Sequence, residues 1–334
     1  MKRWFLWGVI GICLLLAAVA VAAYALMSAR MAGLDGEQKE YIYIDRDDTT
    51  DSIRMKSGLG WRWDVYNNVL SYRPRTGRYR MEPEMTCLQF YRRLRNGIQE
   101  PMKLVVPTSR TMPRLGALLS HSLMMDSAEI VSVLTDSTYL WAKGYTAATV
   151  PALFIPNTYE VYWDISVDKF IERMERENHR FWTAEREAKA KAIGLTHEQV
   201  ATLASIVDEE TANDAEKPMI AGLYLNRLRI GMPLQADPTV KFAVGDFSLR
   251  RILNKHLRVE SPYNTYLVEG LPPGPIRIAS IAGLEAVLNH TEHPYLYMCA
   301  KEDFSGTHNF ASTLAEHNRN ARRYINALNR RGIK

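Results

Sequence analysis

The longest apolar run of the chain lies at its start. Residues 4–29 carry no charged side chain, and Trp4–Met27 is almost entirely apolar. At about 1.5 Å rise per residue, a helix of this length crosses the ~30 Å hydrocarbon core of a bilayer. The run therefore predicts a transmembrane anchor, with a cleaved signal peptide as the alternative, although the apolar region of such a peptide usually has only about 7–15 residues. Lys2 and Arg3 precede the run and only Arg30 follows it closely, so we expect a cytoplasmic N-terminus.

Short strand and helix patterns alternate after this run. Such alternation predicts a compact α+β module. The predicted strands are Glu40–Ile44, Gly77–Arg80 and Met102–Val106, and the predicted helices are Trp61–Leu70 and Thr86–Asn96, the latter ended by Gly97.

The middle of the chain favours helices on either side of an aromatic segment. Helical patterns cover Thr111–Leu134 and, with many opposite charges, Asp168–Ile193. Between them, the prolines and aromatic residues of Pro151–Trp163 exclude a helix and predict an extended segment. Its rings suit the apolar faces of sugars lining a groove, and core packing explains them equally well.

The clearest helical periodicity begins near residue 196. Thr196 and Gln199 form a capping-box signal at the start of a predicted helix, Thr196–Thr211. Apolar residues then recur at helical spacing, namely Val200, Leu203, Ile206 and Val207.

Three acids stand at the end of this helix. At about 100° per residue, Glu210 falls beside Leu203 and Val207, whereas Asp208 and Glu209 are expected to point away. An acid against an apolar wall is desolvated, so its pKa rises and it can donate a proton. The negative charge of Glu209 is expected to raise the pKa of Glu210 further. The alternative is a helix end with three ordinary surface acids.

The remaining elements follow from apolar runs and breakers. They are a helix over Lys217–Arg229 capped by Gly231, a rigid turn at Leu271–Pro275, a buried strand at Pro294–Ala300 and a closing helix over Ser312–Arg331.

Composition excludes several classes of protein. Beyond Arg30 the chain has 39 basic and 37 acidic residues, a balance of +2, which is no nucleic-acid footprint. Three cysteines exclude a disulfide framework, although one bridge between Cys87 and Cys299 is open outside the cytoplasm. No metal-ligand spacing is present, and no cofactor is implied.

A group of arginines interleaved with tyrosines follows the first predicted helix. A solvated face is the simpler interpretation, and contact with an acidic polymer or the membrane surface is the functional one. The arginines are Arg73, Arg75, Arg78, Arg80, Arg92, Arg93 and Arg95.

Four separated motifs carry a family resemblance. They are LASIVDEET (Leu203–Thr211), Ala221–Val240, SPYNTYLVEGLPPGPI (Ser261–Ile276) and GTHNF (Gly306–Phe310). In order and spacing they resemble the endolytic murein transglycosylase family, also called YceG-like, over most of residues 150–334. The resemblance continues more weakly through Pro151–Trp163 and Gly77–Asn96.

The resemblance implies an α+β fold built in three parts. An N-terminal transmembrane helix is followed by a small LysM-like α+β subdomain and then by a mixed α/β catalytic domain with a glutamate-bearing helix. The expected segments are 1–30 for the cytoplasmic tip and anchor, 31–110 for the LysM-like subdomain, 111–195 for a helical linker region and groove wall, and 196–334 for the catalytic domain. The LysM-like part is expected to bind glycan, with a simple spacer as the alternative.

The resemblance also implies a set of site residues. Glu210 matches the family's catalytic glutamate, although Asp208 and Glu209 stand where Glu and Lys are commoner. For Asp237 a structural role in a turn is favoured over substrate contact, and Arg227 is expected to pair with an acid. A hydrogen-bonded loop explains several of the others equally well. The implied substrate-binding residues are Asn226, Gln235, Asp237, Tyr263, Asn264, Thr265, His308 and Asn309.

The implied activity is an endolytic lytic transglycosylase of the inner membrane. It would cleave between N-acetylmuramic acid and N-acetylglucosamine in nascent peptidoglycan strands and leave 1,6-anhydro ends. The expected partners are glycan strands, the membrane through residues 4–27, and peptidoglycan synthases or division proteins. A muramidase using Asp237 as base and a non-catalytic wall-binding scaffold are the alternatives. A longer 31–40 linker would be expected to change product length.

Overall fold

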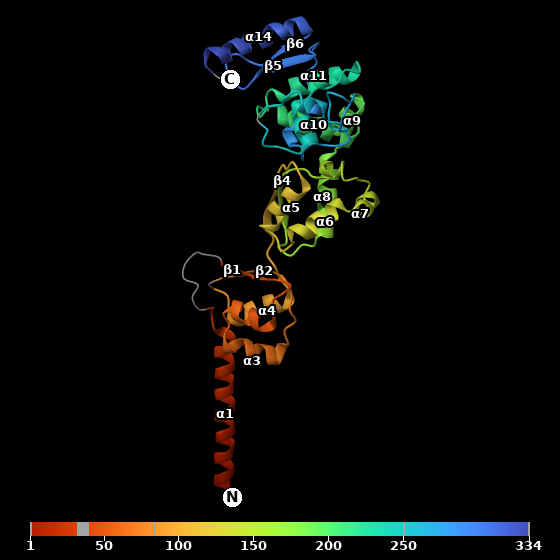
Figure 1. Ribbon diagram of the computed structural model, residues 1–334. Helices are drawn as coiled ribbons and strands as arrows, with labels where there is room; N and C mark the ends of the chain where they lie inside the picture. Colours follow the sequence, from red (N-terminus) through yellow and green to blue (C-terminus); the bar gives the residue numbers. More distant parts are fainter. Residues whose placement is uncertain (1, 32–39, 83, 250, 333–334) are drawn as a thin grey trace. The chain divides into compact units, whose positions relative to one another are not determined.

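The protein is a mixed α+β chain that divides into two compact units. The computed structural model describes residues 2–31, 40–82, 84–249 and 251–332 (Figure 1). Unit 1 comprises residues 1–104, 122–124 and 159–165, and unit 2 comprises residues 105–121, 125–158 and 166–334. Two of the passages of the chain between the units fall within strands β3 (Met102–Val106) and β4 (Asn157–Val161).

The N-terminal helix α1 (Lys2–Ser28) is the apolar run. Residues 3–28 of α1 are long and apolar enough to cross a membrane, with a mean hydropathy of 2.7 in the most apolar window, and their side chains are not buried by the protein. Within the described part of the chain this is the one helix that meets the criterion. A single-pass anchor fits these properties, as a signal sequence does.

The rest of unit 1 pairs a two-stranded sheet with three helices. Strands β1 and β2 are antiparallel, with Ile42 opposite Tyr79. The strand and helix predictions for this region are confirmed within one residue at each end. The bounds are β1 (Glu40–Ile44), α2 (Thr50–Ser57), α3 (Trp61–Leu70), β2 (Gly77–Met81) and α4 (Cys87–Asn96).

Local signals explain why α4 starts and stops where it does. Thr86 and Gln89 form a complete capping box at its start. At its end Gly97 adopts a φ of 68°, a left-handed conformation that a side chain would disfavour. Trp63, Tyr91 and Phe90 then fill the core of the unit at 1% exposure or less.

Part of the arginine group is engaged within unit 1. The Arg78 guanidinium lies 3.5 Å from the ring centroid of Tyr41. Arg80 and Arg93 both reach Glu82, at 3.6 and 3.3 Å. These contacts favour the structural interpretation of the group over a polymer-binding face.

Unit 2 begins with a helical region that is more broken than the sequence predicts. Its bounds are α5 (Met112–Ser120), α6 (Ser127–Thr135), α7 (Ser137–Ala142), the 3₁₀ helix η1 (Val150–Leu153), α8 (Val167–Phe181) and α9 (Ala184–Ala192). The single helices predicted over Thr111–Leu134 and Asp168–Ile193 are wrong. Asp126 and Thr183 cap new helix starts inside those segments, because their side chains accept backbone N–H groups of α6 and α9.

The aromatic segment Pro151–Trp163 is extended in strand β4, as predicted, but its first three residues lie in the 3₁₀ helix η1. Pro151 sits in the first turn of η1, where a helix does not need its missing N–H. Phe154 is 2% exposed and packs 6.4 Å from the ring of Phe170, so core packing accounts for it.

The second half of unit 2 surrounds the helix α10 (His197–Glu210). It packs against the neighbouring helices α11, α12 and α13, and Val200, Leu203 and Ile206 are fully buried between them. The other bounds are α11 (Lys217–Arg229), α12 (Asp237–Val244), η2 (His256–Arg258), α13 (Ile281–Leu288), β5 (Tyr297–Ala300), β6 (His308–Ala311) and α14 (Leu314–Arg330). Strands β5 and β6 are antiparallel, and α14 packs against both.

Several smaller predictions in this half need correction. Asp237 opens helix α12 and does not lie in a turn. The first turn of a helix tolerates a proline, so Pro238 does not prevent the helix from starting here. Ile230 caps α11, and Gly231 follows it with a φ of 67°. The strand predicted over Pro294–Ala300 is shorter and only partly buried. Cys87 and Cys299 are both free thiols.

Candidate active site

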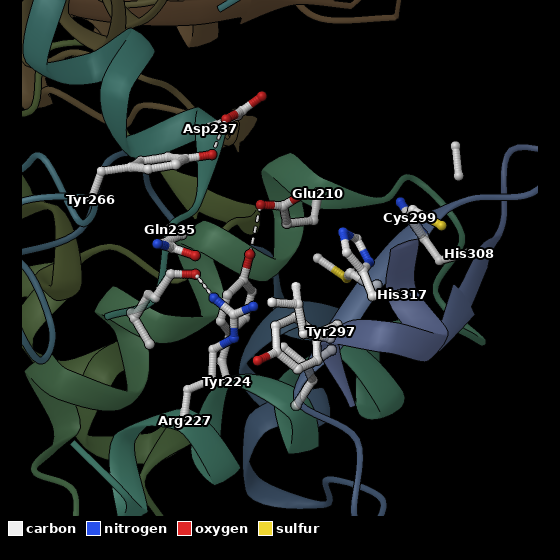
Figure 2. A pocket seen from close by; sticks show the side chains of 15 residues that line it. Glu210, Tyr224, Arg227, Gln235, Asp237, Tyr266, Tyr297, Cys299, His308 and His317 are labelled. Carbon is white, nitrogen blue, oxygen red and sulfur yellow. Dashed lines mark hydrogen bonds between the residues drawn. The ribbon is translucent and has the colours of Figure 1, made fainter. Parts of the chain in front are cut away.

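The last residue of α10 opens onto a cavity of unit 2. The cavity has a volume of about 390 Å³ (Figure 2). Its polar lining comes from α10, α11, the segment before α12 and the first residue of α12, the loop that carries Tyr266, the β5–β6 sheet and α14. The labelled residues are Glu210, Tyr224, Arg227, Gln235, Asp237, Tyr266, Tyr297, Cys299, His308 and His317.

Glu210 combines a desolvated carboxyl with a firm hydrogen bond. The Tyr224 Oη donates to Glu210 Oε1 at 2.7 Å (Figure 2). Burial raises the pKa of Glu210 to about 7, and the negative charge of Asp237 adds to the rise. The Tyr224 bond and the charges of His308 and Arg227 oppose it. Glu210 can therefore hold a proton near neutral pH.

The two neighbouring acids are mostly shielded from solvent and paired, so they are not ordinary surface acids. Asp208 accepts Lys217 Nζ at 2.7 Å and the Ser280 N–H at 2.6 Å. Glu209 accepts a two-pronged contact from Arg110, at 2.8 and 2.7 Å, and a third bond from Arg277.

These partners neutralise the charge of Glu209. Arg110 and Arg277 hold the pKa of Glu209 below its usual range, although burial alone would raise it. The predicted rise in the Glu210 pKa from Glu209 is therefore wrong, and Asp237 is the acid that contributes to it.

The shifted pKa of Glu210 predicts a specific pH dependence of stability. The folded pKa, about 7, exceeds the ordinary value of 4.5, so the folded state binds the proton more tightly and loses stability as pH rises from 4.5 through 7. Glu210→Gln removes this loss. We expect equal melting temperatures for variant and wild type at pH 4 and a more stable variant at pH 8, by roughly 3 kcal/mol. A variant that is no more stable than wild type at pH 8 would contradict a desolvated carboxyl.

Gln235 and Asp237 are presented to the cavity by an unusual backbone. Gln235 has a φ of 50°, a left-handed conformation that costs energy for a residue with a side chain. Thr265 fixes it: the Gln235 N–H donates to the Thr265 carbonyl at 3.0 Å and the Ala236 N–H donates to Thr265 Oγ1 at 3.0 Å. Tyr266 Oη donates to Asp237 Oδ1 at 2.7 Å. This arrangement aims an amide and a carboxylate at the space before Glu210.

His308 reaches the cavity from the opposite wall. The Glu216 side chain is 7% exposed and makes two contacts with His308. Its carboxylate accepts the backbone N–H of His308 at 2.7 Å and lies 3.0 Å from the ring nitrogen Nδ1. The second ring nitrogen, Nε2, is not engaged by Glu216. The pair holds the imidazole in one orientation.

The structure thus brings four of the nine implied site residues to the cavity, namely Glu210, Gln235, Asp237 and His308. The other five do not line it. Asn226 donates to the carbonyls of His293 and Tyr295, and Asn264 donates to those of Leu257 and Val259.

The remaining three of these five residues also have contacts away from the cavity. Tyr263 packs against Phe242, with ring centroids 4.6 Å apart, and Asn309 donates to Glu302. Thr265 is 1% exposed and supports the Gln235 backbone. Ring packing therefore places Tyr263, and Asn309 and Thr265 use polar groups in hydrogen bonds away from the cavity.

Two residues of α11 that line the cavity were not among the implied site residues. Tyr224 and Arg227 lie three positions apart and so share one helix face. Arg227 does not pair with an acid: its guanidinium donates to the carbonyls of Leu296, Pro233 and Leu234. The same spacing rule, applied to α11 as it was to α10, would have found both.

Known proteins share this combination of fold and motifs. The sequence profile of the YceG-like family matches residues 51–323. The chain belongs to the YceG-like family.

Two named relatives are matched over only part of their length. Over 167 residues the chain is 38% identical to an endolytic murein transglycosylase of Bacillus subtilis, an alignment covering 50% of this chain and 45% of that protein. An endolytic murein transglycosylase of Streptococcus pneumoniae is 23% identical, over 94% of this chain and 64% of its own length. The chain therefore spans about half to two thirds of these relatives. A crystal structure of a YceG-like protein from Listeria monocytogenes matches with a TM-score of 0.57 and 25% identity, over 85% of this chain and 99% of that one.

Proposed function

We propose that this YceG-like chain is an endolytic peptidoglycan lytic transglycosylase. It would cleave the bond between N-acetylmuramic acid and N-acetylglucosamine inside glycan strands and leave 1,6-anhydromuramic ends. The observation that carries the proposal is Glu210, a carboxyl with a pKa near 7 that opens onto a cavity large enough for sugar rings. The names of the relatives support the same reaction.

One carboxyl suffices for this reaction. Because Tyr224 donates to Glu210 Oε1, the proton of the neutral acid belongs on Oε2. Glu210 Oε2–H would protonate the bridging oxygen, and the C–O bond would break with an oxocarbenium-like centre at C1. The resulting Glu210 carboxylate would then accept the proton of the muramic C6 hydroxyl. At the same time the C6 oxygen would form a bond to C1 and close the 1,6-anhydro ring. The nucleophile belongs to the substrate, and Glu210 ends protonated as it began.

The other cavity residues would bind and orient the sugar. Gln235 offers both a donor and an acceptor for hydroxyl or N-acetyl groups, and His308 offers a ring nitrogen. Asp237 lies where a negative charge would stabilise the developing cation. Nothing in this scheme requires Asp237 to activate water, so we favour the transglycosylase over the muramidase.

The experiment is a digest of long uncrosslinked glycan strands by the full chain and by Glu210→Gln. Products ending in 1,6-anhydromuramic acid, absent with the variant, are expected. Products one water heavier would make the protein a muramidase, and intact strands with retained binding would make it a scaffold.

Tyr224→Phe tests the donor to the acid. Losing a hydrogen bond to a charged group costs about 1.5–3 kcal/mol, so the carboxylate intermediate is less stable and turnover should fall about 10- to 100-fold. Because the Tyr224 bond lowers the pKa of Glu210, its removal should move the alkaline limb of the pH–rate profile to higher pH. Tyr145→Phe, at a residue outside the cavity lining, is the control and should leave the profile unchanged. An unshifted profile in Tyr224→Phe would contradict the assignment.

The proposal assigns roles to the whole chain. Residues 1–30 would form a single-pass anchor with a cytoplasmic N-terminus, 31–110 a LysM-like module that binds glycan, 111–195 a linker and groove wall, and 196–334 the catalytic domain outside the cytoplasm. The LysM-like assignment is supported by the paired strands β1 and β2 and the helices packed with them in unit 1. Synthases or division proteins would be its partners. The linker expected to set product length falls largely on residues 32–39, outside the described residues.

A further inference from the structure

A helix of unit 1 is fixed beside the end of α1. Tyr66 Oη, on α3, donates a 2.8 Å hydrogen bond to the carbonyl oxygen of Leu26, in the last turn of α1. At the start of α4, the Cys87 N–H donates to the Ala29 carbonyl at 2.8 Å. Because Leu26 lies at the end of the apolar run, the hydrogen bond sets α3 at the level where that run ends.

The face of α3 that points away from the core carries exposed apolar side chains next to the polar Asp64 and Asn68. Trp63 and Tyr66 are buried on the inner face. Trp61, Val65 and Val69 recur at four-residue spacing on the outer face, and the side chains of Trp61 and Val69 are 60% and 77% exposed. Figure 1 shows α4 on one side of α3 and the length of α1 extending away on the other. The outer face therefore faces the side occupied by the membrane if α1 spans one.

An unpaired cation stands on the same face. The Arg62 guanidinium carbon lies 5.0 Å from the ring centroid of Trp61. Its Nε is buried without a hydrogen-bond partner among the described residues. The nearby acid Asp64 is already paired, with Arg54 at 2.6 Å. Nε is thus shielded from solvent, and the terminal guanidinium nitrogens of Arg62 have no acid or acceptor among the residues that the structure describes.

We propose that α3 is an interfacial helix that lies on the membrane surface beside the anchor. Trp61, Val65 and Val69 enter the boundary between headgroups and acyl chains, where tryptophan is favoured, and Arg62 binds the phosphate of an anionic phospholipid. This inference rests on the proposed anchor. Attachment at two points, α1 and α3, would prevent unit 1 from rotating freely about the anchor.

The test places an environment-sensitive fluorophore on single cysteines of the full chain in phosphatidylglycerol-containing nanodiscs. One probe is carried by the native Cys13 in α1, with Cys299 changed to Ser. The others are carried by Val69→Cys and Ile98→Cys, with Cys13 also changed to Ser. Cys87 is 3% exposed and remains unlabelled. Ile98 is the matched control, a 56% exposed apolar residue of unit 1 next to α4.

The Val69→Cys probe should be quenched by lipids labelled near the headgroup, and iodide should quench it at least threefold less than the Ile98→Cys probe. Equal iodide quenching at both positions, with the Cys13 probe quenched by acyl-chain labels, would overturn the interfacial helix and leave the anchor standing. A Cys13 probe that lipid labels do not quench would overturn both.

A second comparison tests Arg62. Arg62→Gln in the Val69→Cys chain should raise iodide quenching about twofold in anionic nanodiscs, whereas Arg92→Gln, which removes an exposed charge from α4, should not. Equal effects of the two substitutions would overturn the phosphate contact.

Discussion

Glu210→Gln is expected to reduce strand cleavage by about 10⁴-fold, the upper range for a general acid–base group, because Glu210 serves first as acid and then as base. Glutamine keeps an oxygen that can accept the Tyr224 hydrogen bond, so the cavity should retain its shape. The measurement is the initial rate of new chain ends on uncrosslinked strands, together with the affinity for a strand too short to be cut.

The matched control lies on the same helix. Glu198→Gln makes the same chemical change near the other end of α10, where Glu198 Oε2 contacts Thr196 Oγ1. We expect its rate to stay within about twofold of wild type, because it lies outside the cavity lining. A Glu210→Gln variant that still cleaves within tenfold of wild type would show that another group is the acid.

Lys217→Met is expected to cost about 3–5 kcal/mol of unfolding free energy, the usual result of removing one partner from a buried ion pair. The side chains of Lys217 and Asp208 are only 7% and 3% exposed, so the variant leaves the Asp208 carboxylate shielded from water and without its cationic partner. Because Asp208 also accepts two hydrogen bonds from Ser280 at the start of α13, its pairing joins α10, α11 and α13. The measurement is the midpoint of denaturant unfolding of unit 2.

A surface pair provides the comparison for this variant. Lys189→Met breaks the ion pair with Glu185 on α9, whose side chains are 35% and 75% exposed, and should cost less than about 0.5 kcal/mol. Adding Asp208→Asn to Lys217→Met removes the uncompensated charge and should restore part of the loss. Equal effects of Lys217→Met and Lys189→Met would contradict a buried pair.

The sequence was most informative where chemistry is local. Capping residues and apolar spacing predicted α3, α4 and α11 almost to the residue, because the stop and start signals lie within a few positions of the helix ends. The same periodicity placed Glu210 beside apolar neighbours. It could not predict how Asp208 and Glu209 are paired, because their partners Ser280 and Arg110 are 72 and 99 residues away.

In the candidate site, too, residue types could be chosen from the sequence, whereas contacts between distant residues could not. Gln235 and Asp237 could be selected by residue type, but their presentation depends on distant partners. Thr265 bonds to the backbone of Gln235 and Ala236, and Tyr266 donates to Asp237 from 29 positions away. Asn226 and Asn264 were selected for the same amide chemistry, yet the side-chain amides of both donate to backbone carbonyls away from the cavity. A single sequence cannot separate these cases, because hydrogen-bonding capacity is identical and only the fold determines where it is used.

The most direct test of the account is the source of the oxygen at the cleaved bond. The full chain should digest uncrosslinked strands in H₂¹⁸O, and the new muramic ends should be analysed by mass. If Glu210 directs the muramic C6 hydroxyl onto C1, the products are 1,6-anhydro ends without ¹⁸O. Reducing ends that carry one ¹⁸O would show that water is the nucleophile and would contradict the single-acid mechanism.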